Sequence, residues 1–479
     1  MELHQLTIKE AQERLRTKKF SSLELVKSCL GRIKKLDSKI NAFITVCEKE
    51  ALEGAKKADK IISHQSSVIS HQSLLGIPIA VKDIFCTKGI KTTAGSKVLE
   101  DYIPVYDSTV VKRLKDVGAI ILGKTNMDAW AHGSSGENSD FGATRNPWDF
   151  EYVPGGSSSG SAAALAADMA LLATGTDTGG SIRLPASFCS LVGLKPTYGR
   201  VSRYGIIAMA SSLDSIGHFT KNIIDSAIIL NITAGQDSYD ATTPRTPVPD
   251  YTKNLKKGIK GLKIGIPKEY FIKGLNKEME KKVKETIKKL EKLGARLVNI
   301  SLPHTEYALA VYYIIQPSEV SSNLARYDGI RFGFSRDRFA DEARRRIMLG
   351  TYALSAGYYE AYYLKAMQVR SLIKKDFDEA FQKVDVLMAP VSPTLPFKLG
   401  EKVNDPLQMY LSDIFTVTAN LAGIPGLSIP IGFIPSASSG QALPVGIQIL
   451  GPQFSEELLF QVGYAYEEKT QWYKRKPEL

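Results

Sequence analysis

Residues 155–181, GGSSSGSAAALAADMALLATGTDTGGS, decide how this chain is interpreted. Two clusters of glycine and serine lie at the ends of an Ala/Leu-rich segment whose composition predicts one helix. Upstream, GIPIAVKD (76–83) places Lys82 at the end of an apolar run that predicts a buried strand. Because Ser157 and Ser181 flank the expected helix, they can meet in space, and we expect Lys82 beside them.

These three residues predict hydrolysis that uses a lysine as base. An ammonium cannot accept a proton, so Lys82 must be kept neutral by burial, which the end of an apolar strand can provide. Ser157 can then bridge Lys82 to Ser181 and pass on the proton of the nucleophile. The glycines of TDTGGS (176–181) leave backbone N–H groups free to face an oxyanion. From the residues alone, a plain Gly/Ser turn remains the alternative.

Two other motifs in the chain are rejected. Gly156–Gly160 fits the G-x-S-x-G elbow of esterases with Ser158 as nucleophile, but EYVP before it makes a poor strand, and the downstream histidines, His218 and His304, lack a distinctive setting. GAIILGKT (118–125) fits a phosphate-binding loop, but its apolar middle is typical of a strand, so Lys124 is expected to be structural.

Composition indicates a large globular chain. The 479 residues are 43% hydrophobic, and strands and helices mixed along the whole length favour one α/β unit over two or three domains. The net charge of +12 is compatible with an anionic partner such as tRNA, or with lysines on solvated helix faces such as that of KEMEKKVKETIKKLEKLG (277–294). The four cysteines are scattered, which argues against a zinc site or a disulfide framework and favours a reducing cytoplasm. The first residues do not resemble a signal peptide, and the absence of a long apolar run argues against a membrane span.

Periodicity gives a coarse map of the elements. Helical patterns occupy three pieces of 7–62, with caps at Thr7 and Ser21 or Ser22, and then 108–117, 277–293, 305–380 and 455–468. Strand patterns occupy 119–123, 262–267, 296–302 and 384–390, two further runs within 420–451, and short runs after Ser181. Residues 236–256 predict a linker. ISHQS occurs twice in 62–75, which we interpret as a surface loop in which His64 and His71 are not metal ligands.

The motifs GIPIAVKD, PGGSSSGSAAA and TDTGGSIRLPASFCSLVGLKPTYGRVSRYG together resemble the amidase signature family. The resemblance implies an α/β fold, a single domain over 1–479 with a mixed central sheet covered by helices. Its parts would be N-terminal helices (1–62), a catalytic core (76–235), a helical pocket cap (305–380) and a C-terminal sheet and helix (384–479).

The family's catalytic residues map onto this chain by motif. They imply Ser181 as acyl nucleophile, Ser157 as a bridging serine after a cis peptide bond, and Lys82 as base. The implied oxyanion hole consists of backbone N–H groups around Thr178, Gly179, Gly180 and Ser181, and Asp177 and Arg183 would brace that loop. No metal site is implied.

Within the family, four further stretches resemble the A subunits of tRNA-dependent amidotransferases: GKTNMDAWAHGSS, RYDGIRFG, RRRIMLGTYALSAGYYEAYY and MYLSDIFTVTANLAGIPGLSIP. The resemblance implies that Arg346 and Asp413 grip the carboxylate and ammonium of glutamine, with Tyr312 lining the pocket. The alternative is that Arg346 and Asp413 form ordinary surface ion pairs.

The same resemblance implies a reaction and partners. Ammonia from glutamine would pass to a B subunit, which holds ATP and Mg and amidates Glu-tRNA(Gln) or Asp-tRNA(Asn) in a complex with a C subunit. This chain itself would carry no cofactor. A free-standing amidase on another amide is the alternative. Departures from the family pattern are Ser159 for glycine, His218 for proline, a shortened segment between Gly333 and Arg344, and the ISHQS duplication.

Overall fold

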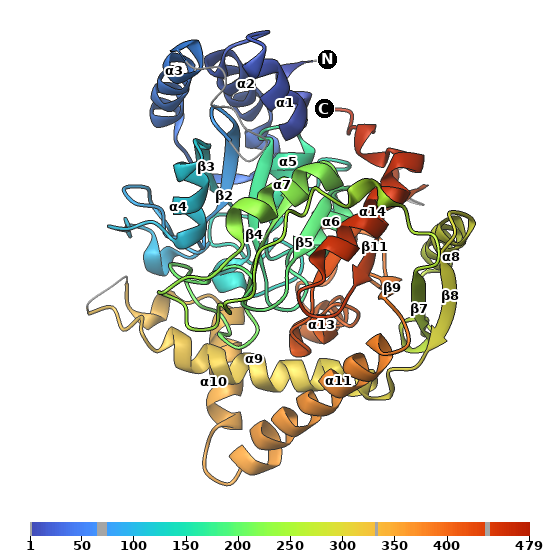
Figure 1. Ribbon diagram of the computed structural model, residues 1–479. Coiled ribbons are helices and arrows are strands. Elements are labelled where there is room, and N and C mark those ends of the chain that lie inside the picture. Colours follow the sequence, from blue (N-terminus) through green and yellow to red (C-terminus); the bar gives the residue numbers. More distant parts are fainter. Residues whose placement is uncertain (1, 65–73, 331–333, 436–440) are drawn as a thin grey trace.

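A mixed β-sheet forms the centre of the molecule (Figure 1). The computed structural model describes residues 2–64, 74–330, 334–435 and 441–479, so most of the ISHQS duplication, with His71, lies outside the described residues. Within them, the strands are β1 (Phe43–Val46), β2 (Pro78–Lys82), β3 (Ile120–Thr125), β4 (Leu172–Asp177), β5 (Val192–Lys195), β6 (Ser215–Thr220), β7 (Lys263–Pro267), β8 (Arg296–Ile300), β9 (Val386–Pro390), β10 (Gly426–Pro435) and β11 (Ala442–Leu450).

These strands form one sheet in the order β1-β3-β2-β4-β6-β5-β10-β11-β9-β7-β8. β2 runs parallel to β3 and β4, whereas β4 is antiparallel to β6 and β10 is antiparallel to both β5 and β11. The predicted α/β class with a mixed central sheet is therefore confirmed. Since β2 and β4 are parallel neighbours, their carboxyl ends, at Lys82 and Asp177, lie at the same edge of the sheet.

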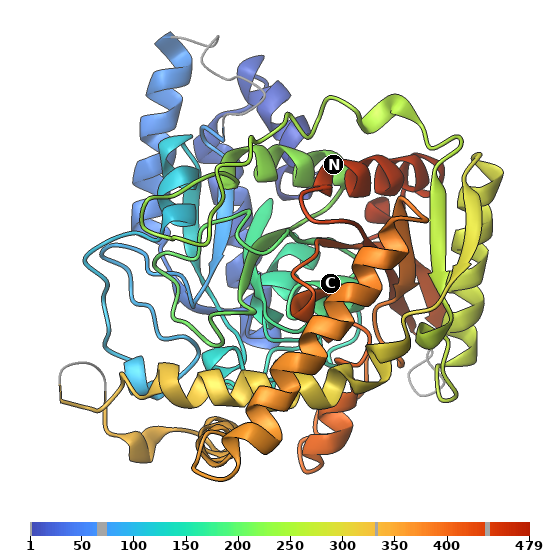
Figure 2. The same cartoon turned by 60° about the horizontal axis from the view of Figure 1, so that its bottom comes forward.

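Helices surround the sheet (Figure 1). The longer ones are α1 (Ile8–Arg16), α2 (Ser22–Ile40), α3 (Glu48–His64), α4 (Thr109–Asp116), α5 (Ser159–Ala166), α7 (Ile223–Thr233), α8 (Lys277–Lys292), α9 (Ala308–Leu324), α10 (Asp341–Ala353), α11 (Lys365–Phe381) and α14 (Glu456–Thr470). α7 and α14 pack on each other and on the middle strands. α9, α10 and α11 lie together along the end of the molecule opposite to α1–α3 (Figures 1 and 2).

Most of the predicted elements are found, with local exceptions. Thr7 and Ser21 cap α1 and α2 through reciprocal side-chain hydrogen bonds with the glutamates three residues on, as their sequence positions predict. The segment 7–62, however, is not all helical. Phe43–Val46 forms β1, which pairs antiparallel with β3, and a run of four residues between two long helices is too short to give a strand pattern.

The prediction of one helix across the Ala/Leu-rich segment is wrong. α5 ends at Ala166, the chain turns at Asp168 with a φ of 57°, and Leu172–Asp177 form β4. β4 lies between β2 and β6, so pairing on both sides outweighs the helical propensity of its alanine and leucine. The segment after Ser181, predicted as strands and loops, also contains a short helix, α6 (Arg183–Phe188).

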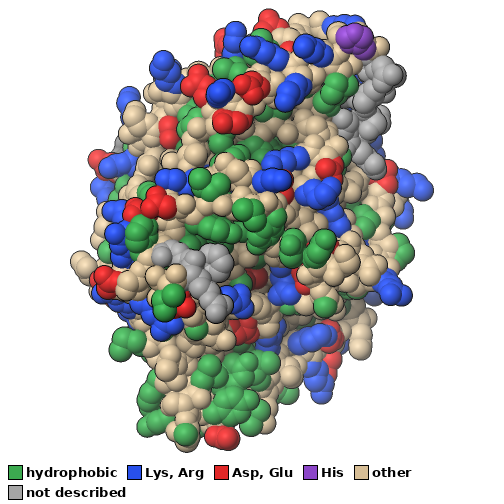
Figure 3. All heavy atoms as spheres, turned by 90° about the vertical axis from the view of Figure 1, so that its left-hand side faces the viewer, with side chains coloured by type: hydrophobic (Ala, Val, Ile, Leu, Met, Phe, Trp, Pro, Cys, Tyr) green, Lys and Arg blue, Asp and Glu red, His purple; other side chains and the backbone are tan. Residues whose placement is uncertain are grey.

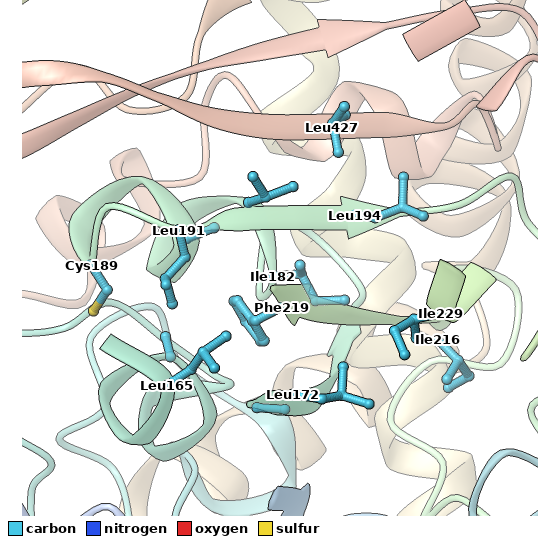
Figure 4. Packing of buried hydrophobic residues seen from close by; sticks show 14 of the residues in the cluster. Leu165, Leu172, Ile182, Cys189, Leu191, Leu194, Ile216, Phe219, Ile229 and Leu427 are labelled. Carbon is cyan, nitrogen blue, oxygen red and sulfur yellow. The ribbon is translucent and has the colours of Figure 1, made fainter. Parts of the chain in front are cut away.

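The core fixes the position of Ser181 through its neighbour Ile182. Ile182 is fully buried and lies among Phe219, Leu194 and other apolar side chains (Figure 4). A Cβ added to Gly175, Gly193 or Gly217, on the three adjacent strands β4, β5 and β6, would lie within 2.8 to 3.1 Å of Ile182 atoms. Glycines on three strands thus leave the space that Ile182 fills, and this packing anchors the loop that carries Ser181.

The lysine-rich helix also follows the prediction. In α8 the stripe Met279, Val283, Ile287 and Leu290 is buried, and Gly294 follows the helix with a φ of 102°. All four cysteines are buried and unpaired. Among the described helices, none has both the length and the apolar character needed to cross a membrane.

Candidate active site

Lys82 lies at the end of β2, fully buried, with three hydroxyl groups around its amine. Its Nζ is 2.9 Å from Oγ of Ser157, 2.8 Å from Oγ of Ser158 and 2.8 Å from Oγ1 of Thr176. The Ser158 hydroxyl is 3.2 Å from the carbonyl oxygen of Thr176 and can donate to it, which leaves its oxygen to accept from Lys82. A neutral amine has two donors and one lone pair, so this geometry leaves that lone pair available to the Ser157 hydroxyl.

Burial lowers the pKa of Lys82 to about 7, because the interior destabilises the ammonium. The carboxyls of Asp128, Asp177 and Asp214 oppose this shift without cancelling it. Asp128, whose own pKa burial raises to about 7, lies beside the Ser157 peptide, and its amide donates to the Ser157 carbonyl at 3.2 Å. Lys82 can therefore be neutral near neutral pH, as a general base requires.

The structure brings the two serines of the prediction to the same place. The Gly156–Ser157 peptide bond is cis, and the amide of Ser158 donates to the carbonyl of Ser181 at 3.3 Å. Lys82 and Ser157 are fully buried, whereas Ser181 retains 7% of its surface. The residue predicted as nucleophile is thus the one of the three that solvent reaches.

Asp177 and Arg183 hold the loop between β4 and α6. Arg183 donates to both carboxylate oxygens of Asp177 at 3.1 Å, and Asp177 also accepts from the amide of Gly180 at 2.8 Å. Burial alone would raise the pKa of Asp177, but the Arg183 guanidinium outweighs it and brings that pKa to about 2. The carboxylate therefore stays charged, and its hydrogen bonds restrain the loop on which Ser181 lies.

The backbone amides before Ser181 are not equivalent. The amide of Gly180 is engaged by Asp177, while those of Thr178, Gly179 and Ser181 have no hydrogen-bond partner among the described residues. The Gly179 carbonyl accepts from Oγ1 of Thr416 at 2.5 Å, which fixes the peptide plane next to these amides. The backbone amides of this loop that remain free to donate are thus those of Thr178, Gly179 and Ser181, whereas the Gly180 amide donates to Asp177.

Asp413 and Arg346 are buried near this loop, 7% and 3% exposed, so they are not surface ion-pair residues. Asp413 accepts from the hydroxyls of Ser134 at 2.7 Å and Tyr313 at 2.9 Å, and the Ser134 carbonyl accepts from the amide of Gly156 at 2.8 Å. Burial raises the pKa of Asp413 to about 6. One acid and one guanidinium of opposite charge are therefore buried in this region, and Arg346 also lines a cavity.

Tyr312 is buried against the loop at Gly179 and makes no hydrogen bond to Asp413 among the described residues. A Cβ added to Gly179 would come within 2.6 Å of the Tyr312 hydroxyl oxygen, so this ring packs directly on the Gly179 backbone. Its neighbour Tyr313 makes the hydrogen bond to Asp413. Both tyrosines come from α9, and Arg346 comes from α10, so the helices of 305–380 supply these three side chains.

Within the described residues, neither the esterase-like motif around Ser158 nor the phosphate-loop motif that contains Lys124 forms the site that it would predict. Ser158 bonds Lys82 rather than a histidine, His218 bonds Ser226 at 2.8 Å, and His304 pairs with Asp376 at 2.9 Å. Lys124 lies on β3, fully buried, 2.8 Å from the Phe85 carbonyl and 3.4 Å from Asp83. His218, His304 and Lys124 thus make structural contacts, whereas Ser158 belongs to the surroundings of Lys82. No group of three or more potential metal ligands occurs in the part of the chain that the structure describes.

Several supporting groups at the site are not identified from the sequence, and only one of them has a signal there. Ser158 and Thr176 complete the surroundings of Lys82, and Ser134 and Tyr313 hold Asp413. Ser158 stands in a run of three serines, and only the fold distinguishes it from its neighbours. The one available signal is TGTD, in which Thr176 lies one residue before Asp177 at the end of β4.

Comparisons with known proteins agree with this geometry. The model of the amidase family matches residues 24–460. The chain is 53% identical, over 99% of both chains, to a Geobacter metallireducens protein named as the A subunit of glutamyl-tRNA(Gln) amidotransferase. A crystal structure of the Thermotoga maritima protein of that name is 42% identical, covers 100% of this chain and 98% of its own, and has a TM-score of 0.83. A peptide amidase from Stenotrophomonas maltophilia is 30% identical over 98% of both chains, with a TM-score of 0.81. The chain therefore belongs to the amidase family.

Proposed function

We propose that this chain is the glutamine-hydrolysing A subunit of a glutamyl-tRNA(Gln) amidotransferase. The observation that carries the proposal is the occurrence of a buried Lys82–Ser157–Ser181 group together with the buried side chains of Asp413 and Arg346. A free amino acid has one ammonium and one carboxylate, and one buried group of each opposite charge suits it. The relatives named for this activity match the chain over its whole length.

In the proposed reaction, Oγ of Ser181 attacks the side-chain carbonyl carbon of glutamine. Its proton passes to Ser157, whose own proton passes to neutral Lys82. The negative oxygen that forms faces the free amides of the loop. Lys82 returns the proton through Ser157 to the leaving nitrogen, the C–N bond breaks, and ammonia departs. Water, activated by the same relay, then hydrolyses the acyl-enzyme to glutamate.

The ammonia would serve a second reaction elsewhere in the assembly. In this proposal a B subunit that binds ATP and Mg activates Glu-tRNA(Gln), or Asp-tRNA(Asn) in some hosts, and a C subunit completes a cytoplasmic heterotrimer. This chain contributes glutamine hydrolysis and no cofactor of its own. The relatives are named as one subunit of an amidotransferase, which supports an assembly of this kind.

An exposed apolar surface supports a role within a larger assembly. Hydrophobic side chains gather at the lower end of the molecule (Figure 3), where α10 turns toward α11. Eight large hydrophobic residues are exposed there: Met348, Leu349, Tyr352, Leu354, Tyr358, Tyr359, Tyr362 and Leu364. A contiguous patch of this kind is unusual on a protein that works alone. We assign it to contact with another subunit of the amidotransferase.

The second candidate is a free-standing amidase on another amide, because a peptide amidase shares the fold. The deciding experiment measures glutamine hydrolysis by the purified chain, alone and with the B and C subunits, Glu-tRNA(Gln) and ATP. We expect strong stimulation by the full complex. High activity on simple amides that is indifferent to the partners would contradict the proposal and favour the free-standing amidase.

A further inference from the structure

The guanidinium of Arg346 makes hydrogen bonds to protein groups through Nε and Nη1 but not, among the described residues, through Nη2. Its Nε donates to Oε1 of Glu342 at 2.7 Å, and its Nη1 donates to Oε1 of Gln316 at 3.0 Å. Among the described residues, Nη2 donates to no group. A guanidinium has five N–H donors in a rigid fork, so fixing Nε also fixes the direction in which Nη2 points.

Glu342 is the residue that fixes this fork. It lies one turn before Arg346 on α10, and its side chain is only 12% exposed. Its Oε1 accepts from Arg346 and also from the hydroxyl of Tyr410 at 3.0 Å, while its Oε2 accepts from Arg345. Three donors from two separate segments therefore hold one carboxylate in place, unlike an exposed pair on a helix surface.

The Glu342 carboxylate lies at the wall of a cavity that Arg346 also lines. Glu342, Arg346 and Tyr410 line a cavity of about 460 Å³, together with Gly133, one residue before Ser134, which hydrogen-bonds Asp413. The ring of Tyr410 stacks on that of Tyr313, with 4.0 Å between centroids. The Arg346 guanidinium lies 5.4 Å from both ring centroids.

Asp413 and Arg346 are kept apart by this arrangement. Within the described residues, the Asp413 carboxylate accepts only from the hydroxyls of Ser134 and Tyr313, and no ion pair joins it to Arg346. Arg346 instead has Glu342 as its internal partner. Without that partner, a long arginine side chain would be free to turn toward the acid across the stacked rings, and the two charges would then satisfy each other.

We propose that Glu342 is a positioning residue, which orients Arg346 so that its Nη2 edge faces the α-carboxylate of glutamine while Asp413 receives the ammonium. The inference rests on the proposed function, since it assigns a residue to the recognition of that substrate. Orienting the guanidinium beforehand lowers the entropy that binding must overcome. The effect is on binding of the amino acid and leaves the chemistry at Ser181 untouched.

The test compares Glu342→Ala and Glu342→Gln in the assembled complex. Glutamine retains an acceptor oxygen for Nε of Arg346, whereas alanine does not. We expect Glu342→Ala to raise KM for glutamine about tenfold or more while kcat stays within about twofold of wild type, because losing a hydrogen bond to a charged group weakens binding by about that factor. For Glu342→Gln we expect both KM and kcat to stay within about threefold of wild type. Glu280→Ala, which removes an exposed pair with Lys284 on α8, is the matched control and should change neither constant.

A second measurement avoids turnover altogether. In a Ser181→Ala background, the Kd of glutamine measured by calorimetry should rise by the same factor on adding Glu342→Ala. A drop in kcat with KM unchanged, an unchanged Kd, or a Glu342→Gln variant as impaired as Glu342→Ala would each overturn the proposal. A wild-type complex that neither hydrolyses nor binds glutamine would instead overturn the proposed function, so the two failures are distinguishable.

Discussion

Nζ of Lys82 lies 2.9 Å from Oγ of Ser157, and both groups are fully buried. This contact joins the carboxyl end of β2 to the loop before α5, two segments separated by 75 residues in sequence. A lysine in such a place can act as a base only when neutral, and burial has already lowered its pKa to about 7. The state of Lys82 should therefore control the dependence of the reaction on pH.

The first prediction concerns this pH dependence. Protonation removes the lone pair, so kcat for glutamine hydrolysis should fall as pH drops through about 7 and reach a plateau above it. Lys82→Met should lower kcat at least about a hundredfold at every pH, since the relay loses its base. Steady-state kinetics from about pH 5.5 to about pH 9, on either side of that pKa, check both. A profile that is flat across the region around this pKa would argue against Lys82 as the base.

A second prediction concerns Ser158, the hydroxyl that accepts from Lys82 at 2.8 Å. Ser158→Ala removes one of the groups that orient the amine, and kcat should fall about five- to tenfold, in line with the loss of one hydrogen bond. Ser157→Ala should cost much more because the proton route is cut. Ser159→Ala is the matched control, since its hydroxyl bonds Thr144 and not Lys82. Equal losses for Ser158 and Ser159 would show that the loop, and not the amine, was disturbed.

A third prediction separates binding from chemistry at Asp413. Asp413→Asn should raise KM for glutamine about tenfold or more with a smaller change in kcat, because the ammonium loses its buried counter-charge. Burial places the pKa of Asp413 at about 6, so in the wild type KM should rise as pH falls below about 6. Asp116→Asn, in an exposed pair with Lys112, should leave both constants unchanged. A variant whose KM keeps the wild-type value would remove Asp413 from the substrate pocket.

A fourth prediction concerns stability. Arg183→Met strands the Asp177 carboxylate in the core and should lower the free energy of unfolding by about 3–5 kcal/mol. Because Arg183 outweighs burial and sets the folded pKa of Asp177 to about 2, below its ordinary value of 3.8, this pair contributes its full stability above about pH 4 and loses it as pH falls toward 2.

Urea unfolding by circular dichroism measures this loss. Arg338→Met, which removes an exposed pair with Glu100, should change the unfolding free energy by at most about 1 kcal/mol. An equally small change for Arg183→Met would mean that the pair is dispensable for the loop.

Much of the fold follows from local patterns. The strand that ends in Lys82, the amphipathic stripe of α8 and the caps at Thr7 and Ser21 depend on residues close in sequence, and all are found as predicted. β4 departs from the prediction because its alanine and leucine favour a helix in isolation. Only its pairing with β2 and β6, made by residues far away in sequence, turns it into a strand.

The residues of the site also fall into those that local motifs predict and those that only long-range packing brings in. Lys82, Ser157 and Ser181 are predictable from glycine- and serine-rich motifs whose chemistry is local, and the structure brings them together. Glu342 and Tyr410, whose contact forms only when α10 packs beside the segment after β9, leave no signal in the sequence. Long-range contacts of this kind depend on the packing of whole helices, which the residues alone do not specify.

The measurement that tests the central claim most directly is the Ser181→Ala variant of the assembled complex, assayed for formation of Gln-tRNA with glutamine and, separately, with ammonia. Removing the nucleophile should abolish the glutamine-dependent reaction and leave the ammonia-dependent reaction at its wild-type rate, because ammonia bypasses this chain's chemistry. Loss of both activities, or retention of the glutamine-dependent one, would contradict the role assigned to Ser181.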